Sequence, residues 1–89
     1  MMVRVENMKG NTGKAVTNQF LIYTSEGVYL QSYGSIIAFK PFDGKIQLDA
    51  NYWDYSKTSG RYRNNFLQET KAQTERKIKS GEYVLADLN

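Results

Sequence analysis

The sequence predicts a small α+β fold, with an antiparallel meander of four to five strands followed by one or two C-terminal helices. Residues 3–49 hold short apolar or alternating runs, separated by turns that contain glycine. Residues 59–80 are instead rich in helix formers, and Gly81 stands at a helix-stop position. The length of 89 residues suits a single domain.

The first half of the meander consists of a short strand and a hairpin. Val3 and Val5 alternate with charged residues, which predicts a strand, and residues 8–14 form a loop with two glycines. Residues 15–24 contain the run Phe-Leu-Ile-Tyr, which is typical of a core strand. A turn at 25–27 then joins this strand to residues 28–33, so the two strands form a hairpin.

The second half of the meander contains two further strands. Gly34 predicts a bulge or bend, and residues 35–39 form the next strand. Residues 41–44 carry Pro and Gly and predict a turn. Residues 45–49 alternate polar and apolar with period two, as a half-buried strand does.

Helical spacing appears after residue 58. Thr58 and Ser59 are N-cap residue types, and the pairs Tyr62/Phe66 and Arg63/Leu67 are each four apart, which predicts a helix over 59–67. A strand remains the alternative there because Gly60 weakens a helix.

The remainder of the chain adds a second helix and one short segment. Residues 68–80 predict a helix with a narrow apolar stripe, so most of its surface is expected to face solvent or a partner. Residues 82–88 form a final strand or an ordered tail. We expect one domain over 1–89, with a β-meander in 1–49 and a helical part in 50–89.

The composition argues against familiar enzyme classes. The sequence has no Cys and no His, which removes thiolate chemistry, the commonest general base and the commonest metal ligand. We therefore expect a binding protein rather than an enzyme, with no metal and no cofactor. Asp49 and Asp54 are the only close carboxylate pair, and they are expected to cap turns rather than to do acid–base work.

Location and self-association follow from the same composition. No apolar run approaches the roughly 18 residues that span a bilayer, and Arg4, Glu6 and Lys9 interrupt the start of the chain. We therefore expect residence in the cytoplasm, with no membrane partner. So short a chain needs an aromatic-rich core, which the 13% aromatic content supplies, or self-association, so a homo-oligomer stays open.

The positive charge gathers in one segment. The net charge is +3, yet residues 57–79 hold seven Lys or Arg against two Glu. Residues 1–56 are neutral overall, and residues 80–89 carry two acids. This asymmetry points to contact between residues 57–79 and an anionic surface.

Residues 52–66 combine aromatics, cations and amides within fifteen positions. Aromatic faces can stack on bases and arginines can hold phosphates, so this set would suit single-stranded nucleic acid or a nucleotide. The alternative is that Trp53, Tyr55, Tyr62 and Phe66 form the core, with Arg61 and Arg63 as its solvated rim. The candidate binding residues are Tyr52, Tyr55, Lys57, Arg61, Tyr62, Arg63, Asn64, Asn65, Lys71 and Lys77.

Several runs also carry a resemblance, namely residues 7–14, 18–20, 27–33, 52–58 and 77–83. With these runs the chain resembles a family of small, functionally uncharacterised proteins carried by bacteriophages and plasmids. The resemblance implies a mobile-element origin and transfers no catalytic residue. It leads us to expect a protein in the host-cell cytoplasm that inhibits or sequesters a host component, such as a defence factor, with a host protein or a nucleotide as ligand. The alternative is a module that binds single-stranded DNA or RNA through residues 52–66 and the basic second helix.

Overall fold

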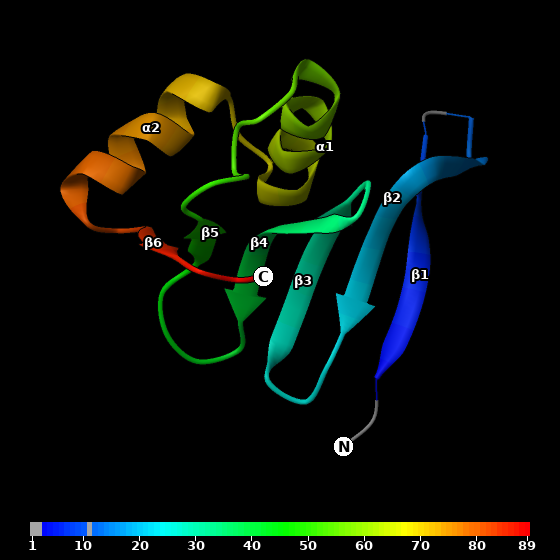
Figure 1. The fold of residues 1–89 in the computed structure, drawn as a ribbon, viewed down its shortest axis with the longest axis horizontal. Helices are drawn as coiled ribbons and strands as arrows, with labels where there is room; N and C mark the ends of the chain where they lie inside the picture. Colours follow the sequence, from blue (N-terminus) through cyan, green and yellow to red (C-terminus); the bar gives the residue numbers. More distant parts are fainter. Residues whose placement is uncertain (1–2, 11) are drawn as a thin grey trace.

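The strands follow one another across the sheet in the order of the sequence. A computed structural model describes residues 3–10 and 12–89, and Asn11, which the sequence places in the first loop, lies outside the described residues. Within the described part, six strands form one sheet in the order β1-β2-β3-β4-β5-β6 (Figure 1). The elements are β1 (Arg4–Lys9), β2 (Ala15–Tyr23), β3 (Gly27–Ser32), β4 (Ser35–Pro41), β5 (Gln47–Asp49), α1 (Lys57–Leu67), α2 (Lys71–Ser80) and β6 (Val84–Ala86).

The expected antiparallel meander is confirmed as β1 to β5, and the final strand is confirmed as β6. Each neighbouring pair from β1 to β5 runs antiparallel. β6 pairs with β5 in parallel, with Leu85 opposite Leu48. Parallel neighbours need a long crossover between them, and here residues 50–83 provide it with both helices.

Two turns of the meander have distinctive backbone geometry. A Cβ at Gly27 would lie 2.2 Å from the carbonyl oxygen of Lys40, so only glycine lets β3 approach β4 this closely. The bend expected at Gly34 is a turn between β3 and β4, in which Tyr33 takes a positive φ of 57°. The bulge lies instead within β4, where the register shifts opposite Leu30 and Gln31.

The helix expected at residues 59–67 exists, and the strand alternative is wrong. α1 begins earlier, at Lys57, because Ser56 is the N-cap and its hydroxyl accepts a 3.0 Å hydrogen bond from the amide of Ser59. The prediction that Thr58 and Ser59 cap the helix is therefore wrong, because both are already helical. Gln68 ends α1 in the left-handed conformation.

α2 is shorter than the predicted span of 68–80. Thr70 caps it in a capping box with Gln73, so α2 begins at Lys71. Gly81 ends it in the left-handed conformation, as its position in the sequence predicts.

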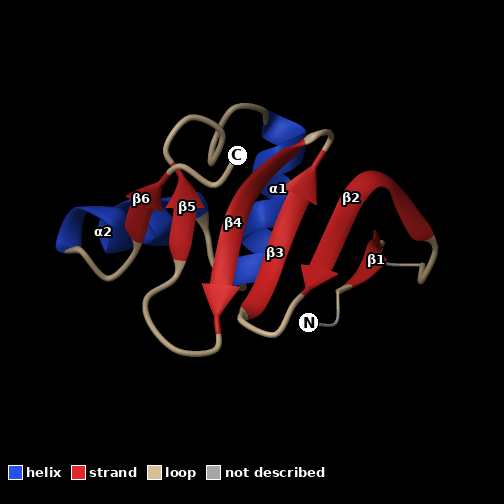
Figure 2. Cartoon of the chain, turned by 60° about the horizontal axis from the view of Figure 1, so that its bottom comes forward, coloured by secondary structure: helices blue, strands red, loops and turns tan. Residues whose placement is uncertain are grey.

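Both helices lie on one face of the sheet (Figure 2). Between the helices and that face lies the core, to which Trp53, Tyr62 and Ile78 add partly buried side chains. The core residues are Met8, Leu30, Ile37, Ala38, Leu48, Phe66, Leu67 and Tyr83.

The other face of the sheet carries no helix (Figure 2). Residues paired in register point to the same face, and alternate residues of a strand point to opposite faces. The positions that alternate with the core therefore form two rows, which we call the open face. One row is Val5, Ile22, Tyr29, Phe39, Gln47 and Val84, and the other is Asn7, Phe20, Gln31 and Ile36.

Candidate functional site

A cleft of about 500 Å³ opens beside the start of α1. Its lining comes from the loop before α1, from α1 itself and from the first residue of α2. The lining residues, which we call the basic cleft, are Asp54, Tyr55, Ser56, Lys57, Gly60, Arg61, Arg63, Asn64 and Lys71. Six of the ten candidate residues thus lie together.

Hydrogen bonds to β3 hold this region in place. The Tyr55 hydroxyl donates to the backbone oxygen of Ser32 at 2.8 Å. The hydroxyls of Ser32 and Ser59 lie 2.7 Å apart and are buried, which ties the first turn of α1 to the same strand. The cleft therefore rests on the sheet rather than on a free loop.

Asp49 anchors the start of the preceding loop, as expected of a turn cap. Its carboxylate accepts from the amides of Asn51 and Tyr52, at 3.0 and 2.9 Å, and from the amide of Leu88 at 2.8 Å. Burial favours the neutral acid, but these hydrogen bonds outweigh it and lower the pKa of Asp49.

Arg63 is not part of a solvated rim, and that prediction is wrong. Its side chain is 1% exposed. The guanidinium donates to the backbone oxygen of Trp53 at 2.8 Å, to Asp54 at 2.9 Å and to the side chain of Asn64 at 2.9 Å. It also lies 5.1 Å from the centre of the Trp53 ring. Arg63 forms the floor of the cleft and holds its wall together.

Asp54 bridges the two helices, and among the described residues its carboxylate accepts no hydrogen bond from a backbone amide, so the prediction that it caps a turn is wrong. One oxygen pairs with Arg63 at 2.9 Å and the other with Lys71, the first residue of α2, at 2.7 Å. Burial works to raise the pKa of Asp54, but the hydrogen bonds from Lys71 and Arg63 outweigh it and hold the pKa below its usual value. Hydrogen bonding to Asp54 raises the pKa of Lys71, so both groups stay charged at neutral pH.

Two cations of the cleft keep their charge available. Within the described chain, Lys57 and Arg61 form no ion pair, and both are exposed. Tyr55 lines the cleft with them, and Tyr52 meets Tyr55 edge to face with ring centres 5.4 Å apart; both tyrosines are exposed. These four side chains form the outer part of the site.

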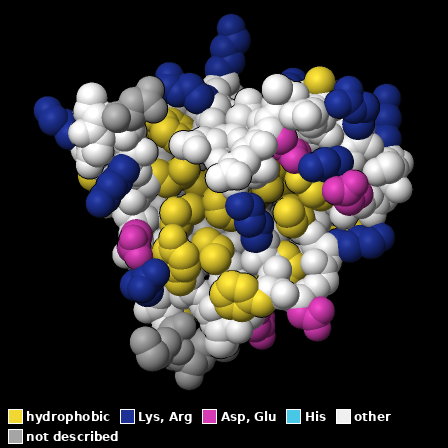
Figure 3. All heavy atoms as spheres, turned by 180° about the vertical axis from the view of Figure 1, so that it is seen from behind, with side chains coloured by type: hydrophobic (Ala, Val, Ile, Leu, Met, Phe, Trp, Pro, Cys, Tyr) yellow, Lys and Arg dark blue, Asp and Glu magenta, His cyan; other side chains and the backbone are white. Residues whose placement is uncertain are grey.

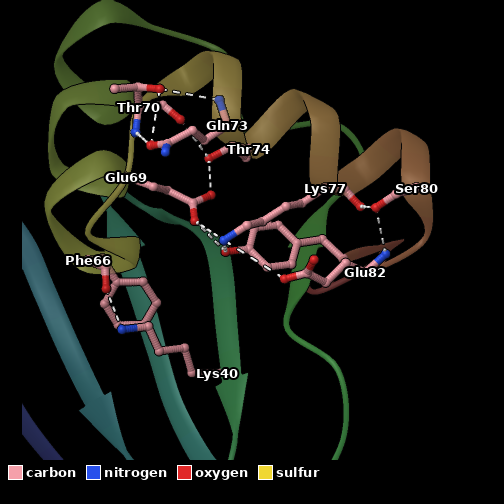
Figure 4. Close-up of polar contacts among 10 residues, drawn as sticks. Lys40, Phe66, Glu69, Thr70, Gln73, Thr74, Lys77, Ser80 and Glu82 are labelled. Atoms are coloured by element: carbon pink, nitrogen blue, oxygen red, sulfur yellow. Dashed lines mark hydrogen bonds and ion pairs between the residues drawn. The ribbon is translucent and has the colours of Figure 1, made fainter.

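Three candidate residues lie elsewhere. Tyr62 packs against the core, while Asn65 lines a separate cleft on the other side of α1. Lys77 lies in the last turn of α2 and pairs with Glu69 at 2.7 Å (Figure 4). Glu69 also accepts from Thr74 and Tyr83, at 2.6 and 2.8 Å. The charge of Lys77 is thus paired with an acid of the same chain.

The separate cleft is apolar and encloses about 300 Å³. Met8, Leu21 and Val28 lie along it, and hydrophobic side chains gather in the middle of this side of the molecule (Figure 3). Lys40 donates to the backbone oxygen of Phe66 and lies 4.3 Å from the centre of the Phe66 ring (Figure 4). Desolvation lowers the pKa of Lys40, while the charge of Glu69 opposes the shift.

The comparison with protein families covers most of the chain. A family model described as "Family of unknown function (DUF8033)" matches residues 3–82. The chain belongs to the DUF8033 family. No curated protein and no solved structure shows significant similarity to it.

The basic cleft of this DUF8033 chain brings together more cations than acids in the part that the structure describes. No group of three acids lies close enough there to hold a metal ion. None of the described helices is long and apolar enough to cross a membrane. The cleft supplies two cations without ion pairs, the start of a helix without acidic residues in its first turn, and the exposed Tyr55, which Tyr52 contacts edge to face. Together these groups can bind phosphate and stack on a flat ring.

The sequence did not indicate two features of this DUF8033 chain. The role of Asp54 as a bridge depends on the packing of α2 against the loop before α1, which no local pattern encodes. Lys40 in the apolar cleft was missed as well. The available signal was its place in the strand: Lys40 follows Phe39 directly, so the two side chains point to opposite faces of the sheet.

Proposed function

We propose that this protein binds single-stranded nucleic acid in the basic cleft. The observation that carries the proposal is the grouping of Lys57 and Arg61, both free of ion pairs, with the exposed rings of Tyr52 and Tyr55. Cations that hold the phosphate backbone and aromatics that stack on bases are the two parts of a site for single strands.

The electrostatics of the cleft favour an anion. The four cations of the lining face one carboxylate, and Arg63 and Lys71 already neutralise it. The positive N-terminal end of the α1 helix dipole adds to the potential of the cleft, and no acid in the first turn of α1 offsets it. A strand that crosses the cleft would place a phosphate between Lys57 and Arg61, with a base against Tyr55.

The test is the binding of short labelled oligonucleotides, followed by fluorescence anisotropy as a function of salt. The wild-type chain should bind at low salt and lose affinity as salt rises. The double variant Lys57→Gln/Arg61→Gln should weaken binding at least about tenfold, and the logarithmic salt slope should fall by roughly 0.7 for each phosphate that is no longer neutralised. Tyr55→Leu should weaken binding with the salt slope unchanged.

The matched control is Lys79→Gln, which removes an exposed cation at the far end of α2. It should leave affinity within about twofold of wild type, because that charge lies outside the cleft. Absence of binding at low salt, or an equal loss in the control variant, would refute the proposal.

A second candidate is the inhibitor of a host protein that the resemblance leads us to expect. Tyr and Arg are enriched in protein interfaces, and Tyr55 and Arg61, which are both exposed and line the same cleft, offer one of each. An acidic host protein retained by the immobilised wild-type chain and lost on the double variant would support this candidate. Recovery of the same proteins on both chains would contradict it.

A further inference from the structure

We infer that the apolar cleft on the other side of α1 binds small aliphatic monocarboxylates, with the ammonium group of Lys40 paired to the carboxylate and the apolar walls packed around the chain. The cleft encloses about 300 Å³, at the lower end of the range for ligand pockets, so it suits a small ligand. It shares no lining residue with the basic cleft, so the inference is independent of the proposed function.

The apolar walls of this cleft continue the core towards the surface. α1 lies behind β3 and β4 and leaves β1 and β2 without a helix (Figure 2). Met8 of β1 and Phe66 of α1 belong to the core, while Leu21 of β2 and Val28 of β3 pack against it. All four line the cleft. A ligand there would therefore contact mostly apolar atoms from three strands and one helix.

Lys40 brings a charge into these apolar surroundings. Of the described residues that line the cleft, Lys40 alone is charged, and no acid in the described ranges forms an ion pair with it. Desolvation lowers the pKa of Lys40, and the more distant charge of Glu69 only partly offsets this shift. The carboxylate of Glu69 pairs instead with Lys77 (Figure 4). The charge of Lys40 thus lacks a close anionic partner.

The contact between Lys40 and the end of α1 leaves part of this charge available. Lys40 donates to the backbone oxygen of Phe66, in the last turn of α1. The C-terminal end of a helix carries roughly half a negative charge, whereas the ammonium group carries a full positive one. The ammonium group has three donors, and no second acceptor meets it among residues 3–10 and 12–89. A carboxylate can accept from the donors that remain.

A monocarboxylate matches the cleft in both charge and polarity. Its single negative charge balances the single cation, whereas a phosphate dianion would leave a second charge against apolar walls, which is costly. Asn65, also in the lining, offers an amide donor for the second carboxylate oxygen. An apolar lining with a few polar groups is typical of sites for small molecules.

The experiment is a titration of the purified full chain with sodium octanoate, followed by NMR of the methyl groups of Met8, Leu21 and Val28. Octanoate carries both the charge and the apolar chain, while 1-octanol carries the same chain without the charge. Octanoate, added up to about 2 mM, should shift these signals with a Kd of about 1 mM or tighter.

Two replacements of Lys40 test the ion pair. Lys40→Met should weaken octanoate binding about tenfold, between the losses typical of exposed and of buried ion pairs. Binding of 1-octanol should stay within about twofold of wild type, because the apolar walls remain. Lys40→Gln keeps a donor for the backbone oxygen of Phe66 but removes the charge, so it should behave as Lys40→Met does.

The matched control is Lys45→Met. Lys45 is exposed and donates to the backbone oxygen of Gly81 at the end of α2, so it makes the same kind of contact outside the cleft. Lys45→Met should leave the binding of both ligands within about twofold of wild type, because that charge does not reach the cleft.

Three results would overturn the inference. The first is the absence of shifts at the cleft methyl groups with octanoate. The second is an equal effect on octanoate and 1-octanol in both Lys40 variants, which would trace the change to the fold rather than to the ion pair. The third is tighter binding of N-acetyl-leucine than of octanoate, which would assign the cleft to the C-terminus of a peptide.

Discussion

Replacing Arg63 by methionine removes the guanidinium from the floor of the basic cleft and keeps an unbranched side chain against Trp53. The wild-type guanidinium donates to Trp53, Asp54 and Asn64 from a fully buried position. Methionine donates to none of them, so the carbonyl of Trp53 and one oxygen of Asp54 lose their partner. We expect a large loss of stability and a small direct effect on the outer cations.

The size of the loss follows from the burial of each partner. Removing one member of a buried ion pair typically costs about 3–5 kcal/mol. Asp54 is 28% exposed and keeps Lys71 at 2.7 Å, which reduces the cost of the charge left behind. We therefore expect the free energy of unfolding to fall by about 2–4 kcal/mol. In a domain of this size that corresponds to a melting temperature lower by roughly 10–25 °C.

The assay is urea denaturation followed by Trp53 fluorescence, with Arg61→Met as the matched control. Arg61 lies two residues earlier in α1 and is exposed, so its replacement should change stability by no more than about 0.5 kcal/mol. The two variants should separate stability from binding, because Arg61→Met should weaken oligonucleotide binding while the fold stays intact. A loss below about 1 kcal/mol in Arg63→Met, or equal losses in both variants, would refute the structural role of Arg63.

Three further predictions concern α1, α2 and pH. Gly60→Ala should raise the free energy of unfolding by about 0.5–1 kcal/mol in urea denaturation, because alanine is the better helix former and the new Cβ would lie an ordinary 3.6 Å from its nearest neighbour. Thr70→Ala should lower it by about 1 kcal/mol and reduce helical circular dichroism, because it breaks the capping box with Gln73. The lowered pKa values of Asp54 and Glu69 stabilise the fold above the unfolded-state pKa of about 4, and this contribution is lost as pH falls through the folded-state values. Denaturation midpoints measured from pH 7 to about pH 3 should therefore stay level at first and then fall, and Asp54→Asn should flatten the fall.

The meander could be predicted from the sequence because its signals are local. Gly27 and Gly34 stand at turns between runs of β-forming residues, and neighbouring strands pair through these short turns. The parallel pairing of β6 is different, since it joins residues 47–49 to 84–86 across both helices. No local pattern specifies that pairing, so the sequence predicts the strand but not its partner.

The helical spacing of Arg63 indicated that its side chain is buried, but its charge led to the opposite prediction. It lies four residues after Ser59 and four before Leu67, and all three are buried on one side of α1. The helical period therefore placed Arg63 on the inward side. A charged residue is rarely buried without a partner, and the partner Asp54 could be recognised only in the folded chain.

The open face also left a trace in the sequence. The run Phe20 to Tyr23 has four apolar or aromatic residues in succession, so both faces of β2 had to carry apolar side chains. The sequence indicated a core strand from this run. It did not indicate that the helices cover only one of the two faces, because that depends on where residues 50–83 cross the sheet.

The parallel strand at the end of the crossover has a consequence for how the molecule opens. β6 has three residues, and its pairing with β5 closes a connection of 34 residues (50–83). Forming so distant a pairing costs chain entropy that the adjacent hairpins do not require. We therefore expect β6 to pair after the meander has formed and to separate before the meander opens, so its amide protons should exchange with solvent sooner than those of β3. Separation of β6 should also remove the hydrogen bond from Leu88 to Asp49, whose carboxylate holds the start of the loop that leads into the basic cleft, so we expect that loop to become more mobile.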